Sequence, residues 1–289
     1  MKKVMFMGLI LGALAATACT PASVSNENFS RKVGQMEIFT LVEAERDGNA
    51  GILIGADEEI LNRYIPAEGF KHTANAYLIK NADQIILIDT GTGADGIIIE
   101  KIKSLGVNPE DVNVVLITHL HGDHYGSLQK DGNAVFPNAT IYLSAKDVEY
   151  FTEINPNEGA INALAPYSSR IVTFEPGELE SEEISAILPG ITPIAAYGHT
   201  PGHTIFLIEN EYEKLLIIAD LLHVALVQFP IPEISAVYDV DPVAAAQIRR
   251  QVLSYAAENK IPIGGMHIVN PGTGTVEVDG DGFKFTPFK

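Results

Sequence analysis

His119-Leu120-His121-Gly122-Asp123-His124 places three imidazoles and one carboxylate in a single short stretch, directly after the apolar run 112–118. Side chains alternate along an extended segment, so the first two imidazoles lie on one side of it. The glycine then lets the chain turn, which directs the aspartate and the third histidine back toward the same point. Imidazole and carboxylate bind borderline divalent metals such as zinc, and burying them without a metal or hydrogen bonds is costly. The stretch therefore predicts a metal site rather than a polar loop that happens to be rich in histidine.

Length and composition limit the classes of protein and partner. The chain has 289 residues and no sign of a long linker, so we expect one large domain over residues 34–289. Its formal net charge of −18 argues against nucleic acid and anionic membrane surfaces as partners, because phosphate groups are bound by basic surfaces. Cys19 is the only cysteine, so the fold cannot rely on internal disulfides, and any zinc must be held by histidines and carboxylates.

The N-terminal residues are typical of an export signal. Two lysines precede an apolar run that ends in small residues, which predicts a signal peptide over residues 1–18. Cys19 follows at the position of the lipidated cysteine in bacterial lipoprotein signals, but Ala16 stands where such signals usually carry leucine. Lipidation at Cys19 and simple cleavage before it are therefore both open. We expect an exported protein, in the periplasm, lipid-anchored to the outer membrane or secreted, in which the polar residues 19–33 form a flexible tether.

From residue 34 onward, short apolar runs alternate with turn signals, and the spacing of apolar residues separates strands from helices. We expect helices at 57–64, 95–105, 144–152 and 241–258, with Ser144 and Asp241 as the N-caps of the last two. We expect strands at 36–42, 74–80, 84–89, 112–118, 140–143, 171–174, 191–196, 204–208 and 214–219, then an apolar run at 261–266 and a hairpin around 279–280. Strands dominate, with helices between them, so the fold class is an α/β or α+β layered sandwich.

Further ligand-type residues follow apolar strands elsewhere in the chain. His199 lies in a tight turn after one predicted strand, Asp220 follows an apolar run, and His267 ends a late apolar run. A lone carboxylate after a run of apolar residues needs a polar or charged partner. Loops at strand ends are also where rigid scaffolds place functional side chains. We therefore expect these residues to belong to the same site as the histidine-rich stretch.

The ligand-type residues follow one another in an order that resembles the metallo-β-lactamase superfamily: His119-X-His121-X-Asp123-His124, then His199, Asp220 and His267. Residues 87–91 match the early aspartate-containing turn of that family, and residues 198–203 match its third motif. The resemblance extends from about residue 36 to the end, and it is specific because separate motifs agree in order. It implies an α/β fold, a four-layer αβ/βα sandwich, with two divalent metal ions, expected to be Zn²⁺, at one edge of its two sheets.

The resemblance also implies which residues bind the metals. One metal would be held by the first two histidines of the opening stretch and by the third motif, and a second by the remaining residues, with one carboxylate between them. The implied ligands are His119, His121 and His199 for the first metal, Asp123, His124 and His267 for the second, and Asp220 as the bridge.

Three further residues are interpreted around this set. Asp89 would orient an imidazole by accepting a hydrogen bond from it, although an aspartate that only caps the turn after a strand is an alternative. His203 is interpreted as a hydrogen-bonding residue of its own turn rather than as a ligand. His72 has no supporting motif, and we assign it no role.

The residues after the bridging position narrow the subfamily. The zinc β-lactamases of this fold do not use a bridging aspartate, so Asp220 argues against β-lactam hydrolysis. Acyl-homoserine lactonases keep that aspartate and place a tyrosine three residues later, where this chain has His223. Residues 219–230, followed by 239–242, are similar to the methyl parathion hydrolase group, whose relatives include esterases and lactonases.

We therefore expect an exported dinuclear metal-dependent hydrolase that cleaves esters or lactones of a small-molecule substrate, acyl-homoserine lactones among them. A hydroxide between the two metals would attack the carbonyl, and Asp123 or Asp220 would relay a proton. The main alternative is hydrolysis of organophosphate triesters. A β-lactamase and a non-catalytic metal-binding lipoprotein are further alternatives, and the sequence does not predict the oligomeric state.

Substrate contacts are expected mainly in the apolar segment 224–238, which holds two prolines and predicts a semi-rigid pocket wall. His223 and Phe229 are the candidate substrate-binding residues, with Tyr238 as a second aromatic candidate. The alternative is that this segment only packs beneath the last helix. The segment 48–66 is expected to overhang the same site.

Overall fold

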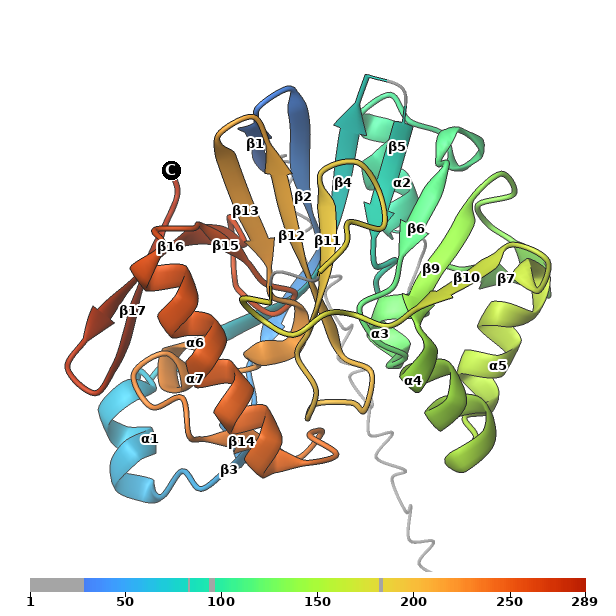
Figure 1. Cartoon of the computed structure of the whole chain (residues 1–289). Coiled ribbons are helices and arrows are strands. Elements are labelled where there is room, and N and C mark those ends of the chain that lie inside the picture. Colours follow the sequence, from blue (N-terminus) through green and yellow to red (C-terminus); the bar gives the residue numbers. More distant parts are fainter. Residues whose placement is uncertain (1–28, 83, 94–96, 182–183) are drawn as a thin grey trace, which may run out of the picture.

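A computed structural model of the chain describes residues 29–82, 84–93, 97–181 and 184–289. Two β-sheets pack face to face, and helices cover the outer face of each sheet (Figure 1). The four-layer αβ/βα sandwich predicted above is therefore confirmed. The predicted signal peptide and Cys19 lie outside the described residues. Within the described residues, no helix is long and apolar enough to cross a membrane.

The first sheet is 7-stranded, in the order β1-β2-β4-β5-β6-β9-β10. Its first four strands pair antiparallel, and the pairs from β5 to β10 are parallel. The strands are β1 Phe29–Val33, β2 Met36–Asp47, β4 Lys71–Asn81, β5 Gln84–Ile88, β6 Val114–Leu116, β9 Thr140–Ser144 and β10 Ile171–Phe174.

Strand β1 corrects the prediction of a tether over residues 19–33. Its residues pair with β2 along the whole strand, from Phe29 opposite Thr40 to Val33 opposite Met36. Val33 is fully buried, and a two-residue turn with Gly34 at φ +56° connects the two strands. Ser30 and Lys32 are exposed and Arg31 is partly buried, so the strand has a polar appearance in the sequence. Residues 29–33 are thus an ordered edge strand.

The second sheet is 6-stranded, in the order β11-β12-β13-β15-β16-β17. Only the β13–β15 pair is parallel within it. The C-terminal hairpin predicted around residues 279–280 is present and forms the last two strands. The strands are β11 Ile191–Ala195, β12 Thr204–Asn210, β13 Glu213–Ile217, β15 Ile263–Gly264, β16 Thr273–Asp279 and β17 Gly282–Pro287, and the short pairs β3 Leu53–Ile54 with β14 Ser235–Ala236 and β7 Gln129–Lys130 with β8 Asn133–Ala134 lie outside both sheets.

The four predicted helices are present with a change near residue 150, and the described residues also form short helices at 122–125, 158–164 and 225–228 that were not predicted. Helix α7 begins as predicted, because the Asp241 carboxylate accepts hydrogen bonds from the amides of Val243 and Ala244. Ser144 stands at the N-cap of α4, but its side chain makes no capping hydrogen bond, and a π-helix over Tyr150–Ile154 follows that short helix. The helices are α1 Glu58–Tyr64, α2 Ile97–Ser104, α3 Gly122–Tyr125, α4 Ala145–Glu149, α5 Glu158–Leu164, α6 Ala225–Gln228 and α7 Pro242–Glu258.

Three apolar layers hold the sandwich together. Successive side chains of β4 point to opposite faces, so Leu78 packs against the helices of the first half while Tyr77 and Ile79 pack between the sheets. In the second half, Leu216 of β13 packs with Val252 of α7 and its neighbours. Because the central strands are buried on both faces, they read as continuous apolar runs in the sequence. The strands therefore form a rigid support for the loops at their ends.

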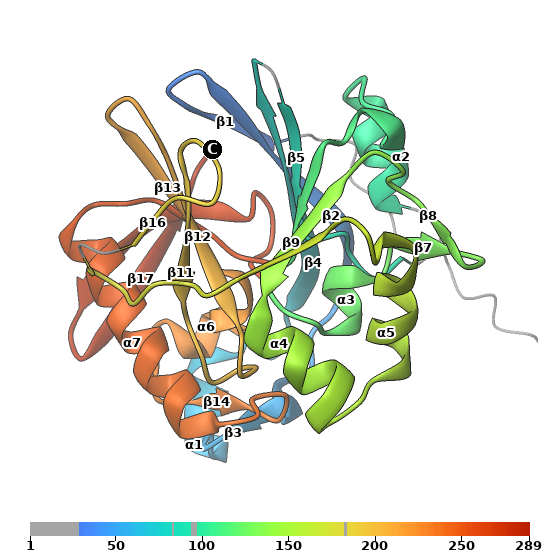
Figure 2. The same cartoon turned by 45° about the vertical axis from the view of Figure 1, so that its right-hand side comes forward.

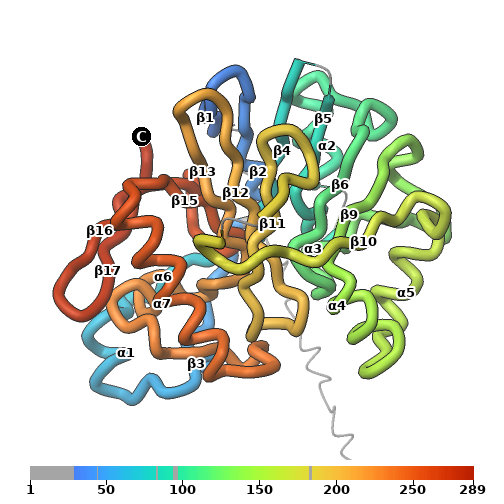
Figure 3. The backbone as a smooth tube through the Cα atoms, viewed as in Figure 1, coloured from blue at the N-terminus to red at the C-terminus, as the bar shows by residue number. Residues whose placement is uncertain are grey.

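The N-terminal segment 48–66 crosses to the other half of the molecule. Figure 3 shows its light-blue backbone, including α1, among the orange and red C-terminal elements. Strand β3 pairs with β14, and side chains of α1 pack with Val224, Val227 and Ile234. Figure 2 shows α3, which contains the last residues of the histidine-rich stretch, Gly122 to His124, close to α4.

Candidate metal centre

The ligand-type residues predicted from the sequence lie together, although they come from both sheets. The loops that supply them follow strands β6, β11, β13 and β15. Asp220 sits in a short turn after β13, and the residue before it, Ala219, has a left-handed φ of +49°. Backbone strain of this kind persists only where the surrounding structure enforces it, and it is common at functional sites.

The first group of side chains forms a compact triangle of imidazoles. His119 Nε2 lies 3.1 Å from His121 Nδ1 and 3.2 Å from His199 Nε2. His199 Nε2 lies 3.0 Å from His121 Nδ1. Three nitrogens this close to one another cannot all donate hydrogen bonds, and one cation between them would use all three lone pairs.

The second group is arranged around one oxygen of a buried carboxylate. Asp220 Oδ2 lies 3.0 Å from His267 Nε2 and 3.3 Å from His124 Nε2. The same oxygen is 3.5 Å from His199 Nε2 in the first group. Asp123 completes the second group, with its carboxylate oxygens 3.6 Å from both His124 Nε2 and His267 Nε2. Asp220 therefore lies between the two groups, where the sequence placed a bridge.

Buried polar atoms without hydrogen-bond partners indicate that these two groups of side chains can bind cations. His124 Nε2 and Asp220 Oδ1 are buried and have no hydrogen-bond partner among the described residues. Burial lowers the pKa of His119 and of His199 well below the usual value, so both imidazoles are neutral, which is the form that binds metals. Burial alone would raise the pKa of Asp220, but His124 and its neighbours hold it well below its usual value. The donor set fits two divalent cations.

Asp89 lies behind the second group, as predicted. Its Oδ2 is 2.7 Å from Nδ1 of His124, and its two oxygens accept hydrogen bonds from the amide and hydroxyl of Thr118. Asp89 itself has a φ of +57°, a conformation that aspartate tolerates better than most residues. With Nδ1 of His124 donating to this carboxylate, Nε2 is left with a lone pair that faces the cluster.

Asp239 has the same relation to the first group, and the sequence analysis missed it. Its Oδ1 lies 2.8 Å from Nδ1 of His199, and its Oδ2 accepts a hydrogen bond from the amide of Ala236. The guanidinium of Arg249, which is fully buried, lies 3.6 Å from Asp239 Oδ2. In the sequence, Asp239 stands two residues before the expected start of a helix. Its own neighbours therefore do not distinguish it from an ordinary turn residue.

Arg249 connects the metal cluster to the pocket wall. From α7 it donates to the carbonyl oxygen of Leu221, just before the wall segment 224–238, and to those of Pro232 and Ile234 within it. Burial lowers its pKa to about 10, so it stays charged at neutral pH. One buried cation thus fixes the backbone beside Asp220, the wall and Asp239 together.

Asp147 is a second buried carboxylate that the sequence analysis did not identify. It accepts hydrogen bonds from the amide of Leu120, between two of the cluster histidines, and from Gly202 and the hydroxyl of Thr200, in the loop of His199. A side chain at Gly202 would bring its Cβ to 2.5 Å from the backbone nitrogen of Asp147, so only glycine fits there. Burial raises the pKa of Asp147 to about 6. Asp147 fixes the two histidine loops relative to each other.

Two histidines near the cluster differ in their contacts. His203 accepts a hydrogen bond at Nε2 from the amide of Asp220 and lies 2.9 Å at Nδ1 from the carbonyl of Ala196, so both nitrogens are used within the fold. His223 Nε2 lies 3.4 Å from Asp220 Oδ2, and together with His199 they form a third group with ligand spacing. His223 therefore lies within ligand distance of the metal cluster. The sequence predicted only a substrate contact for it.

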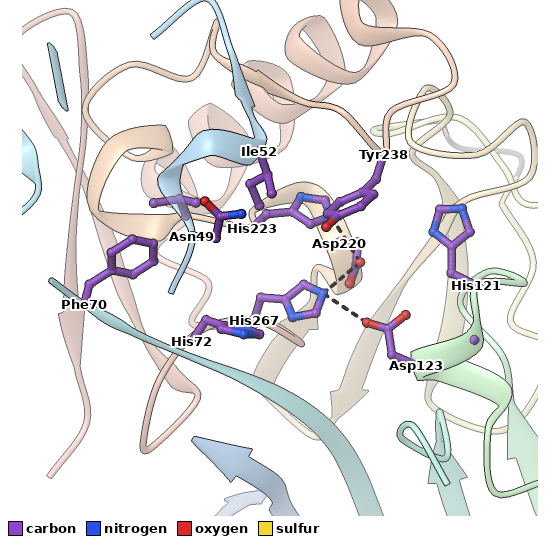
Figure 4. Close-up of a pocket in the computed structure, with 12 residues that line it drawn as sticks. Asn49, Ile52, Phe70, His72, His121, Asp123, Asp220, His223, Tyr238 and His267 are labelled. Carbon is purple, nitrogen blue, oxygen red and sulfur yellow. Dashed lines mark hydrogen bonds and ion pairs between the residues drawn. The ribbon is translucent and has the colours of Figure 1, made fainter. Parts of the chain in front are cut away.

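A pocket of about 460 Å³ opens onto the cluster. His121, Asp123 and His267 lie at its base, and Figure 4 shows His121 and Phe70 at its opposite ends. Asn49 and Ile52 also line it, as expected for a segment 48–66 that overhangs the site. The pocket is therefore bounded by the cluster on one side and by the N-terminal crossing segment on the other.

Of three aromatic side chains near this pocket, Phe229 and His72 depart from the sequence predictions and Tyr238 agrees with them. Phe229 does not line it: its ring is buried and stacks on Phe285 at 5.1 Å between centroids, because α6 turns it toward the C-terminal hairpin. Tyr238, the second candidate, does line it, with its ring 5.7 Å from that of His223. His72, to which no role was assigned, lines it too and lies beside His267.

The comparison with known proteins agrees with this fold and this cluster. The model of the family described as "Metallo-beta-lactamase superfamily" matches residues 70–259. An N-acyl homoserine lactonase of Bacillus cereus is 28% identical over 167 residues, which are 49% of this chain and 60% of the lactonase. The match thus spans less than two thirds of that relative.

Two solved structures are similar over nearly their whole length. The hydrolase AbOPH, described as belonging to the beta lactamase superfamily, has a TM-score of 0.81 and 27% identity, covering 92% of this chain and 99% of its own. AidC, described as a dizinc quorum-quenching lactonase in complex with a product, has a TM-score of 0.77 and 25% identity, covering 91% and 97%. With the family model matching well over half of its residues, the chain belongs to the metallo-beta-lactamase superfamily.

Proposed function

We propose that this protein is a dinuclear metal-dependent hydrolase that cleaves lactones and esters. The observation that carries the proposal is the buried Asp220 oxygen, which imidazole nitrogens from both ligand groups surround at the base of an open pocket. The similarity to a dizinc lactonase and to a Bacillus lactonase supports the reaction class and supports zinc as the metal. The donors, imidazole nitrogen and carboxylate oxygen, suit zinc as well.

In this proposal the residues of the cluster have distinct roles. His119, His121 and His199 would hold one cation, Asp123, His124 and His267 would hold the other, and Asp220 lies within reach of both groups. Two such cations, when bound, would lower the pKa of water to give a nucleophile at neutral pH and would polarise the substrate carbonyl. Asp89 and Asp239 keep the imidazoles in the tautomer whose free nitrogen faces the cations.

Asp123 is the better proton relay of the two carboxylates that the sequence suggested. Its side chain is 37% exposed and lines the pocket, whereas that of Asp220 is 3% exposed. A carboxylate that moves a proton to a leaving group must reach both the substrate and solvent. Asp220 also lines the pocket, but its side chain is nearly inaccessible to solvent and imidazoles surround its Oδ2.

The test is hydrolysis by zinc-loaded protein of γ-lactones, acyl-homoserine lactones and aryl esters that share one leaving group. We expect turnover of these substrates, about two metals per chain by elemental analysis, and loss of turnover in His121→Ala. The proposal is overturned when fully metal-loaded protein turns over none of them above the metal-free background. Phosphotriesters and a β-lactam belong in the same panel, because residues 219–230 resemble methyl parathion hydrolases.

We also propose that the protein is exported, which rests on its N-terminal sequence alone. Two lysines, an apolar run and a small-residue end precede Cys19. Fractionation of expressing cells tests this, with Cys19→Ser separating the two routes. Membrane association that depends on Cys19 supports lipidation, soluble periplasmic protein in both variants supports simple cleavage, and retention in the cytoplasm contradicts export.

A further inference from the structure

A second pocket of about 610 Å³ lies beside the first, beneath the C-terminal hairpin. Its walls come from β16 and β17, from the start of the wall segment at Ala225 and Leu226, and from the residues that follow His267. The proposed reaction requires no residue that lines this second pocket alone. The reaction therefore does not account for the second pocket.

The second pocket adjoins the pocket at the metal centre. Phe70, His223 and His267 line both of them. His267 and His223 stack on each other, with their ring centroids 5.2 Å apart, and His267 also reaches Asp220. A ligand with its reactive group at the cluster thus has the second pocket directly beside it, next to these shared side chains.

The lining of the second pocket is apolar in its interior and charged only at its rim. Phe229, Phe283 and Phe285 lie on its walls, and Leu226 and Val269 line it while remaining 45% and 39% exposed. A contiguous apolar surface with a polar rim often marks a ligand-binding groove. Lysines and acidic residues occur together at the rim, so no net charge selects an ionic ligand.

The walls are fixed before any ligand arrives. The Phe229 and Phe285 rings stack with an interplanar angle of 8°, and the amide of Phe283 donates to the carbonyl of Phe229. A Cβ at Gly282 would lie 2.1 Å from the carbonyl oxygen of Pro230, so the hairpin approaches the wall segment as closely as a glycine permits. A pocket that is already formed binds an apolar group without the cost of ordering its walls.

We propose that this second pocket binds the aliphatic acyl chain of a substrate whose carbonyl lies at the metal centre. The inference rests on the proposed function and refines it: the substrates are lactones or esters with an extended hydrocarbon chain. Each methylene that leaves water for such a pocket is expected to raise kcat/KM by up to about four-fold until the pocket is full. A short acyl group would occupy only the first pocket.

The experiment measures kcat/KM for acetyl, hexanoyl and decanoyl esters of one phenol with the zinc-loaded protein. Leu226→Asp places a charge in the second pocket, and we expect the ratio of decanoyl to acetyl kcat/KM to fall at least ten-fold. Ile54→Asp is the matched control, since Ile54 is equally exposed, at 44%, and lines neither pocket. In the control we expect that ratio to stay within two-fold. An unchanged ratio in Leu226→Asp overturns the inference.

Binding without turnover separates this inference from the proposed function. Calorimetry of butanoate and decanoate measures the chain contribution directly, and we expect decanoate to bind at least ten-fold more tightly, with the difference lost in Leu226→Asp. That result without any hydrolysis supports the pocket and contradicts the function. Hydrolysis without dependence on chain length supports the function and overturns the pocket. Leu226→Trp, which fills the pocket and keeps it apolar, replaces Leu226→Asp where the charged variant does not fold.

Discussion

The imidazoles of the metal cluster and the side chains of the adjoining pocket are held in place in different ways. His124, His199 and His267 each have Nδ1 within 2.8 Å of a carboxylate or backbone oxygen. Tyr238, by contrast, is 51% exposed, and its ring lies 5.7 Å from that of His223. Changes in the cluster should therefore affect metal binding and every substrate, whereas changes in the wall should affect only some substrates.

The largest effect is expected from Asp220→Ala. The variant removes the one carboxylate that lies within reach of both ligand groups. We expect loss of both metals and of nearly all turnover, exceeding the roughly 10- to 100-fold cost of removing an orienting partner. Elemental analysis and kcat/KM for an aryl ester measure this. Retention of two metals per chain would contradict the bridging role.

A smaller loss of metal affinity and turnover is expected from Asp239→Ala. The variant removes the hydrogen-bond acceptor for His199 Nδ1 and the carboxylate beside Arg249. Metal affinity or kcat/KM should fall about 10- to 100-fold, the usual cost of losing such a partner. A chelator competition assay measures the affinity. Glu233→Ala, which changes an exposed carboxylate paired with Arg250, serves as the control and should leave the affinity unchanged.

His223→Ala tests the boundary between cluster and wall. His223 lies within ligand distance of Asp220 but also lines both pockets. We expect the variant to keep two metals and to change the ratio of lactone to ester turnover. If its metal content instead falls as far as that of His121→Ala, His223 is a ligand and the assignment of the cluster must be redrawn.

The smallest effect is expected from Tyr238→Ala. About half of this side chain is exposed, so a bound substrate can cover only part of its surface. Its removal should therefore raise KM no more than about five-fold. kcat for a small acetyl ester should change less than KM. A fall in kcat as large as that in Asp239→Ala would mean that Tyr238 takes part in the reaction and does not merely contact the substrate.

The sequence predicted the cluster because its residues are chemically conspicuous. A histidine or aspartate at the end of an apolar strand is costly to bury, so each one signals a partner. His119, Asp220 and His267 could be found in this way, and their order in the chain indicated the fold. The strands themselves indicated a layered sandwich, since runs that are apolar throughout must be covered on both faces. The four-layer arrangement was implied by the resemblance to the metallo-β-lactamase superfamily.

The residues that the sequence did not reveal depend on contacts between distant segments. Asp147 lies in an ordinary amphipathic helix, and Asp239 precedes a helix start, so only the folded chain shows that they contact the histidine loops. Phe229 was assigned to the wrong pocket because its direction depends on α6 and on the hairpin that covers it. The partner of a side chain across the fold cannot be read from its own neighbours in sequence.

The pairing of β3 with β14 has a consequence for the order in which the protein forms. Leu53 lies opposite Ala236, so the overhanging segment has no partner until most of the domain has left the ribosome. The β2–β4–β5 part of the first sheet can form much earlier, because its strands are close together in the chain. The pocket is thus completed near the end of synthesis. Substitutions in its two walls can accumulate without disturbing the early steps of folding.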